Sequence, residues 1–268
     1  MDVSLPVNKH TVAAYDAPDS AVEIPQYRRL AILAVWAAAA LPMGALAWLV
    51  APALADRFSG PANVPMAKAL LSVLAVGLIW QFVLVLVLVR REQGTLRWPV
   101  VRDALWLRAP RSPKSGRVGG RIWLIVIPLI LVFGAAHELI PTFGVSENRD
   151  FGALLESDTG KEFLSGAWGW YAVILVGFIF NTALGEELLF RGFLLPRMNG
   201  AFGRGDWVAN GLLHSVYHLH VPWAMPGALV DMFTQAYPTK RYRSAWIGIA
   251  VHSAQSVVLA ILVFALVV

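Results

Sequence analysis

Cysteine is absent from the 268-residue sequence, so disulfide bonds, cysteine-ligated zinc, iron–sulfur clusters and thiol nucleophiles are excluded. Charge is also scarce, because 15% of the residues are charged while 57% are hydrophobic. This ratio exceeds what a water-facing surface tolerates, and we expect the chain to lie in a lipid bilayer. The net charge of +5 is then expected to orient the chain in the membrane, and no nucleic-acid partner is expected.

Long apolar runs predict how the chain crosses the bilayer. A transmembrane helix needs roughly 20 mostly apolar residues, and five runs fit this description: 30–54, 69–89, 122–140, 170–190 and 245–268. Two weaker stretches predict short spans or a re-entrant pair: 207–221 and 223–237. The sequence therefore predicts an all-α, polytopic membrane helix bundle with about seven transmembrane segments.

Basic residues predict the orientation of this bundle. Nine lysines and arginines lie between residues 90 and 121, and further ones follow the run that ends at 190 or precede the last run. The positive-inside rule then places the amino terminus in the cytosol. Residues 1–29 carry prolines and mixed charges, and are expected to form a loose cytosolic tail before a single membrane domain over 30–268. The membrane is expected to be the plasma (inner) membrane.

Ionisable side chains interrupt the apolar run at 170–190. Glu186, Glu187 and Arg191 lie there, and a charged group within a span costs about 2.5–3.5 kcal/mol on insertion scales. Glu187 and Arg191 are spaced i, i+4 and are expected to form a structural ion pair on one helix face. Glu186 points about 100° away on the helix. An unpaired carboxylate that faces a bundle interior is usually functional.

Two later segments carry histidines with the same i, i+4 spacing. His214 and His218 share a helix face, and His252 is followed one turn later by Ser256. Counting about 1.5 Å per residue from the predicted cytosolic helix ends places Glu186, His218 and His252 at similar depths of about 14–18 Å. The sequence therefore predicts that these three side chains meet at one buried polar site, on the cytosolic side of the bilayer middle and near the cytosolic leaflet.

Such a site suits the hydrolysis of an amide bond. A carboxylate and a neutral imidazole around one water molecule can take its proton as the water attacks a carbonyl. A second imidazole with a neighbouring hydroxyl, here His252 and Ser256, can donate to the oxyanion. The same set of Glu186, His218 and His252 could instead hold zinc, since two histidines and a carboxylate form a catalytic ligand set. The residues alone leave the metal-free and zinc-dependent readings open.

Three motifs in chain order resemble those of a known family: Glu186-Glu187-x-x-x-Arg191, His218 in the next segment and His252 in the last. They are similar to the CPBP family of intramembrane proteases, which includes CAAX prenyl endopeptidases and bacteriocin-processing or immunity-associated proteins. The resemblance implies that Glu186 activates water with His218 as its partner. It also implies that His252 lies on the oxyanion side, with Glu187 and Arg191 in support.

The resemblance covers about residues 168–260, the expected catalytic half. His214 stands where the family has an aromatic residue, and Ser256 stands where it commonly has asparagine. Both are expected to support the catalytic residues. The implied substrate is a membrane-associated peptide or protein, which is prenylated in one branch of the family. The metal-free enzyme is expected to need no cofactor.

Readings from other classes remain open. A non-catalytic membrane scaffold or immunity-type protein would use the same polar cluster only to fix helix packing. A proton-coupled transporter would also bury glutamate and histidine, but the sequence has no internal repeat of the transporter kind. Asp231 lies in the weaker stretch 223–237 without a basic residue nearby, and is expected to face the same cavity.

Overall fold

The computed structural model describes residues 22–268, which form a bundle of α-helices. In this part of the chain, β-type pairing is limited to one isolated bridge between Arg111 and Val118. The predicted all-α class is confirmed. The elements are α1 (Arg29–Ala45), η1 (Leu46–Val50), α2 (Ala51–Ala55), α3 (Val64–Gln93), α4 (Trp98–Ala104), η2 (Gly120–Ile125), α5 (Val126–Leu139), η3 (Glu147–Arg149), α6 (Phe151–Glu156), α7 (Asp158–Leu164), α8 (Trp168–Ile179), η4 (Phe180–Gly185), η5 (Leu188–Leu194), α9 (Leu195–Arg197), α10 (Asn199–Phe202), η6 (Gly203–Gly205), α11 (Asp206–Tyr217), η7 (Pro222–Ala224), α12 (Met225–Ala228), η8 (Met232–Ala236), α13 (Tyr237–Tyr242) and α14 (Ala245–Val267).

Four helices are long and apolar enough to cross a membrane. Several are continuous through turns of π-helix, as where α8, η4, η5 and α9 follow one another without a break in the helix. Each of the four coincides with a predicted span, and the helical membrane bundle is confirmed. The four helices are Arg29–Ala55, Val64–Gln93, Trp168–Arg197 and Ala245–Val267. The predicted total of seven crossings stays a prediction.

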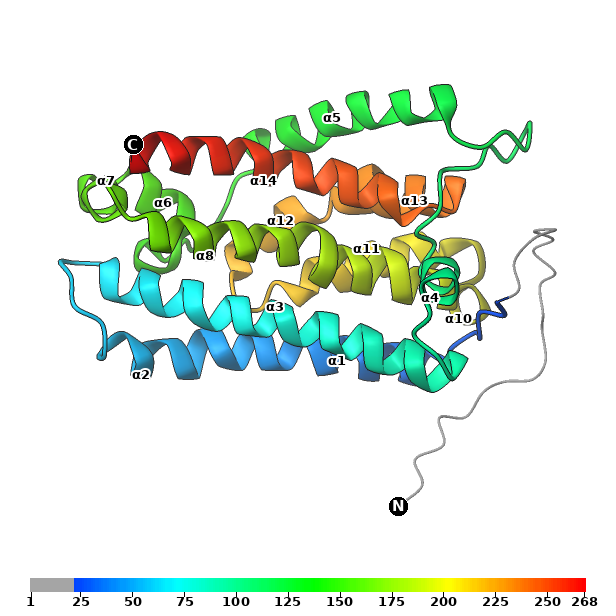
Figure 1. Ribbon diagram of the computed structural model, residues 1–268, viewed down its shortest axis with the longest axis horizontal. Helices are drawn as coiled ribbons and strands as arrows, with labels where there is room; N and C mark the ends of the chain where they lie inside the picture. The colour runs from blue at the N-terminus through cyan, green and yellow to red at the C-terminus, as the bar shows by residue number, and fades with distance from the viewer. Residues whose placement is uncertain (1–21) are drawn as a thin grey trace, which may run out of the picture.

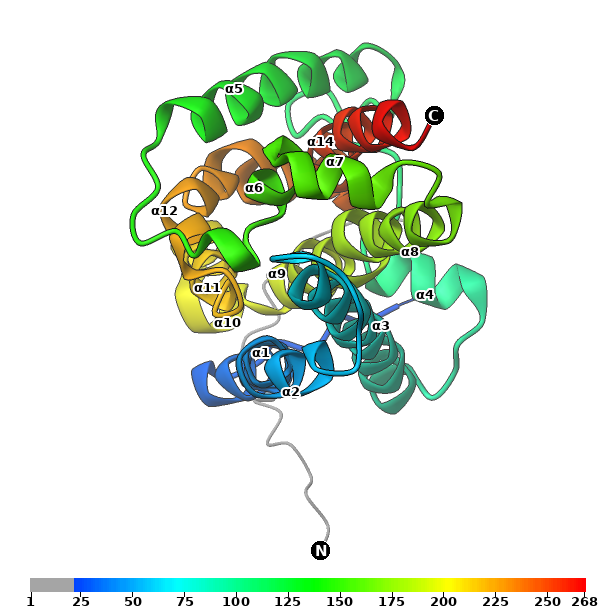
Figure 2. The ribbon, with the colours of Figure 1, turned by 90° about the vertical axis from the view of Figure 1, so that its left-hand side faces the viewer.

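The long helices run side by side along the bundle (Figure 1). α3 packs against α1, α2, α8 and η4, while α14 packs against α8, α5 and η8. Figure 2 shows α5 at the outer edge, beyond α14 and α12. The basic segments around α4, α10 and α13 lie at one end of the bundle (Figure 1), as their predicted location on one side of the membrane requires.

The remaining three predicted spans are shorter in the structure. The run 122–140 becomes the apolar helix Gly120–Ala136, below spanning length, and continues to Leu139 in α5. The weak stretches 207–221 and 223–237 form α11 and η8, which pack against each other and are joined by a connection that contains η7 and α12. The hydroxyl of Ser215 in α11 donates to the carbonyl of Met225, the first residue of α12, at 2.7 Å. Asn210, His214 and Gln235 on this pair are buried, whereas its apolar residues Leu212, Val216 and Phe233 are exposed.

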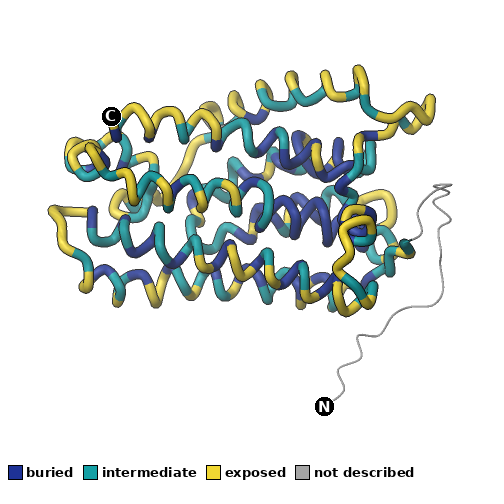
Figure 3. The backbone as a smooth tube through the Cα atoms, viewed as in Figure 1, coloured by how far each residue is buried: buried dark blue, intermediate teal, exposed yellow. Residues whose placement is uncertain are grey.

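The densest part of the core surrounds the second half of the helix Trp168–Arg197. Every residue from 185 to 198 is buried, as the dark segments near the basic end of Figure 3 show. Gly185 permits the close approach of α3, because a methyl group there would lie 2.6 Å from the carbonyl oxygen of Phe180 and 3.2 Å from that of Leu78. This tight packing surrounds the two carboxylates that follow Gly185.

Most of the predicted loose tail lies outside the described residues, but residues 22–28 are anchored to the bundle. The backbone N–H of Tyr27 donates to the carbonyl of Arg197 at 2.9 Å, and the Tyr27 hydroxyl donates to Glu92 at 2.5 Å. Glu92 also accepts from the buried guanidinium of Arg197, whose Nη2 lies 2.6 Å away. Burial and the neighbouring Glu92 carboxylate raise the pKa of the Tyr27 phenol, which therefore keeps its proton as a donor. The prolines and mixed charges of this segment predicted a loose tail. The sequence does not reveal that Tyr27 has partners as distant in the chain as Glu92 and Arg197.

We expect Tyr27→Phe to lower the free energy of unfolding by about 1.5–3 kcal/mol, since a hydrogen bond to a charged group is lost. Unfolding in detergent micelles, followed by tryptophan fluorescence, would measure the change. The control is Tyr171→Phe, whose hydroxyl donates to the Ala260 carbonyl over a longer 3.4 Å. Equal losses in the two variants would show that Tyr27 does not anchor the segment.

Candidate active site

Two turns of π-helix flank the predicted carboxylates. η4 ends at Gly185 and η5 begins at Leu188, so Glu186 and Glu187 lie between them. A π-helical turn contains an extra residue and is frequent at functional sites. Glu186 is 2% exposed and Glu187 is fully buried. The helix thus presents two consecutive carboxylates to the interior of the bundle.

Glu187 forms the predicted ion pair with Arg191, with 3.5 Å between its Oε1 and Nη1 of the arginine. The same Oε1 lies 3.2 Å from Nδ1 of His252 on α14. Gly248, one turn before His252, makes the space for this carboxylate, because a methyl group there would lie 2.5 Å from its Oε2. Sequence reasoning missed Gly248, since nothing in its neighbours in the chain indicates the approach of Glu187.

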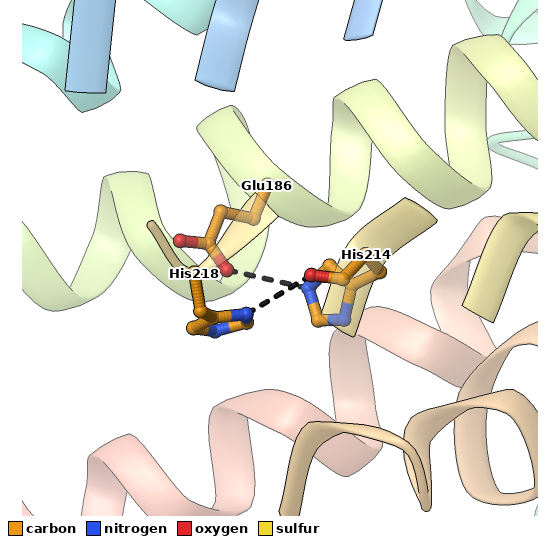
Figure 4. Close-up of side chains that lie close together, drawn as sticks. All are labelled: Glu186, His214 and His218. Carbon is orange, nitrogen blue, oxygen red and sulfur yellow. Dashed lines mark hydrogen bonds and ion pairs between the residues drawn. The ribbon is translucent and has the colours of Figure 1, made fainter. Parts of the chain in front are cut away.

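Glu186 meets a different histidine from the one predicted. Its Oε2 lies 3.4 Å from Nε2 of His214 on α11. His218, one turn further, places Nδ1 3.0 Å from the carbonyl oxygen of His214. Figure 4 shows the Glu186 carboxylate pointing to the His214 ring, with the His218 ring beside both. His214 is therefore central to the cluster, although we predicted it only as a supporting residue.

Asp231 completes the cluster from the segment that precedes η8. Its Oδ2 lies 3.1 Å from Nδ1 of His214, which confirms the expectation that Asp231 faces the same polar site. Nη2 of Arg191 lies 3.4 Å from the same Nδ1. His214 thus connects the carboxylate of Glu186 on one side of its ring with Asp231 and Arg191 on the other.

The three residues of the predicted catalytic set are brought into one region, but not into one equal triad. His252 contacts Glu187 rather than Glu186, and its ring centroid lies 6.3 Å from that of His214. Ser256 is buried one turn beyond His252 on α14. Carboxylates and imidazoles from separate helices therefore converge inside the bundle, as predicted. The carboxylate in contact with His252 is that of Glu187.

One group of three side chains in the described part of the chain has the spacing to hold a metal ion. One ligand atom from each of Glu186, His214 and His218 lies within 4.8 Å of the others. The zinc set predicted from the sequence was Glu186, His218 and His252. The structure places His214 where that set had His252, because His252 is turned toward Glu187.

A mainly apolar cavity of about 240 Å³ lies beside this cluster, without being lined by Glu186, His214 or His218. Its walls come mainly from α3 and α8, and its far end is formed by the loop around Arg149 and Asp150. Asn181 and His220 line the cavity. The ring of His220 is stacked on that of His218, with 5.6 Å between the ring centroids. Its polar loops lie at the end of the bundle opposite to the basic segments (Figure 1).

The fold and the site together define an integral membrane protein, a helical bundle with a buried site of carboxylates and imidazoles. Residues 167–266 match the family model described as Type II CAAX prenyl endopeptidase Rce1-like. This match confirms the resemblance to the CPBP intramembrane proteases in the carboxy-terminal part of the chain, and it supports a peptidase in general. No curated protein and no solved structure matches the chain.

Proposed function

We propose that the chain is an intramembrane endopeptidase that hydrolyses a peptide bond with water activated by Glu186 and His218. The observation that carries the proposal is their separation, since one ligand atom of each lies within 4.8 Å. A single water molecule with two hydrogen bonds of about 2.8 Å can bridge such a gap. The water would lie in a nearly waterless region, where a positioned base is most effective.

Glu186 would take a proton from this water while the water oxygen attacks the carbonyl carbon of the substrate. The proton would pass to the leaving nitrogen as the C–N bond breaks, so that the carboxylate is restored. His218 donates from Nδ1 to the carbonyl of His214, which leaves its Nε2 as an acceptor for the same water. No covalent intermediate with the enzyme is needed.

His252 would stabilise the oxyanion that forms during this attack. Its Nδ1 lies 3.2 Å from Glu187, so a doubly protonated ring could donate from Nδ1 to Glu187 and from Nε2 to the oxyanion. The Glu187 carboxylate would compensate the charge of such a ring. Ser256, one turn away on α14, offers a further donor, although it is shorter than the asparagine that the family commonly has there.

The cavity supports a substrate with an apolar group next to the scissile bond. Leu70, Leu74 and Phe178 are among the apolar residues that line it, and a lipid chain or an apolar peptide segment would fit such a surface. The matched family model names prenylated CAAX substrates, and we extend this class to the present chain. The depths predicted from the sequence place cleavage near the cytosolic leaflet, and the cavity would admit the apolar group of the substrate from the end opposite to the basic segments.

The proposal predicts cleavage of a farnesylated, internally quenched peptide that ends in a CAAX sequence. The purified protein in detergent or liposomes should release fluorescence from this peptide at least tenfold faster than from the same peptide without the farnesyl group. The preference follows from burial of the lipid chain, at about 0.8 kcal/mol for each CH₂. Equal rates would remove the lipidated substrate class, and no cleavage of any membrane peptide would contradict the peptidase.

The scaffold or immunity-type reading remains the second candidate, and buried contacts favour it. Glu187 contacts both Arg191 and His252 within the bundle, as a purely structural cluster would. A scaffold would keep its biological effect when Glu186 is replaced by glutamine. A peptidase loses it with the loss of cleavage. Under either function, we propose that the protein lies in the plasma membrane and crosses it several times.

A further inference from the structure

A line of polar side chains runs from the candidate active site toward the basic end of the bundle. Asp231, Gln235 and Thr239 follow one another at i, i+4 spacing along the helical stretch of η8 and α13, so they lie close to one face of it. All three are buried. Asp231 contacts His214 in the site, and Thr239 directly precedes Lys240 at the basic end. The line therefore joins the site to that end of the bundle.

α14 turns back along this helical stretch and forms a second wall. The backbone N–H of Ser244 donates to the carbonyl of Thr239 at 3.2 Å where the two helices join, and α13 lies beside the first turns of α14 (Figure 1). Gly248 and His252 follow on α14 at i, i+4 spacing. Because Gly248 has no side chain, polar groups of the neighbouring helices can approach its backbone.

Two oxygen atoms from different helices meet at Gly248. A methyl group there would lie 2.5 Å from Oε2 of Glu187 and 3.2 Å from Oγ1 of Thr239. One water molecule with a hydrogen bond on each side spans up to about 6 Å, so it can bridge these two oxygens. We call this contact region the polar seam, formed by Glu187, Arg191, Asp231, Gln235, Thr239 and Gly248.

The polar seam contains buried atoms that have no hydrogen-bond partner among the described residues. They are Oε2 of Glu187, Nε of Arg191, Oγ1 of Thr239, and both the oxygen and the nitrogen of the Gln235 amide. Buried polar groups of native proteins are almost always paired, and ordered water pairs those that other side chains do not reach. The set includes donors and acceptors, and water can pair with both.

We infer that a chain of ordered water molecules occupies the polar seam and connects the solution at the basic end with the candidate active site. Hydrolysis consumes one water molecule for each peptide bond, and the mainly apolar cavity offers few polar groups to conduct it. The substrate's apolar group and the water would then reach the site by separate routes. This supply role rests on the proposed function, whereas the hydration of the seam does not.

The first test compares variants of similar shape on one helix. The double variant Thr239→Val with Gln235→Leu removes polar groups of the seam, and should lower kcat for the farnesylated quenched peptide by a factor of about 10 or more, with KM within about twofold. Thr239→Ser keeps the hydroxyl and should retain the rate. The control is Thr234→Val, because Thr234 is also buried on this helix but its hydroxyl already donates to the Val230 carbonyl at 3.2 Å. Its kcat should stay close to that of wild type.

The second test observes the water directly and needs no substrate. A crystal structure of the full wild-type chain, at a resolution that shows ordered water, should contain water bonded to Thr239 and Gln235, and the double variant should lose it. A dry seam in a map that shows water elsewhere in the bundle would overturn the inference, even if the double variant does not fold. Equal kcat of the folded double variant and Thr234→Val would overturn the supply role.

The two tests together separate this inference from the proposed function. Cleavage of the farnesylated peptide by a protein whose seam is dry would overturn the inference alone. Water in the seam of a protein that cleaves no membrane peptide would overturn the peptidase, and with it the supply role, while the hydrated seam would stand.

Discussion

Replacing Glu186 by glutamine should lower the rate of peptide cleavage by a factor of about 10²–10⁴, the usual contribution of a positioned general base. Glutamine has the same shape as glutamate but cannot take a proton from water. The farnesylated quenched peptide gives the rate. Because Glu186 is buried next to His214, the amide fills the same space and the helix should remain folded.

The matched control is Glu156→Gln, which removes an exposed carboxylate at the end of α6. We expect its cleavage rate to stay within twofold of wild type. Size-exclusion profiles and circular dichroism of the two variants should agree with wild type. Cleavage by Glu186→Gln at the wild-type rate, in protein that is folded, would remove Glu186 from the role of base.

Replacing Arg191 by methionine should lower the free energy of unfolding by about 3–5 kcal/mol, because one partner of a buried ion pair is removed and the other stays. Both Arg191 and Glu187 are fully buried, so water cannot solvate the carboxylate that remains. The measurement is unfolding in mixed micelles with increasing SDS, followed through the eleven tryptophans.

Two further variants make this result specific. Arg102→Met removes an arginine whose side chain is 46% exposed and pairs with Asp103, and we expect a loss of about 0–1 kcal/mol. The double variant Glu187→Leu with Arg191→Leu should recover part of the loss, because no unpaired charge remains. If Arg191→Met were as stable as Arg102→Met, the buried pair would not hold the helix in place.

Local spacing explains the parts of the site that could be predicted from the sequence. An i, i+4 pair on one helix depends only on helix geometry, and the Glu187–Arg191 pair is found as expected. The long apolar runs at 30–54 and 245–268 became spanning-length helices because hydrophobic length is a property of the chain itself. Convergence of carboxylates and histidines followed from the depth of each along its helix.

The partners across helices could not be predicted in the same way. Depth alone does not determine how a helix is rotated, and the sequence does not reveal the π-helical turns that rotate Glu186 toward His214 and Glu187 toward His252. Asp231 was expected in the cavity, but its contact with His214 depends on the connection between α11 and η8.

The π-helical turns on either side of the carboxylates also determine which sequence changes the site tolerates. Each added or lost residue between Phe180 and Leu194 turns the following helix by about 100° and would exchange the neighbours of both glutamates. The connection at 140–146 lies outside the helices and has no such constraint. Grafts between homologues should therefore transfer this helical stretch whole, with its joints placed in loops.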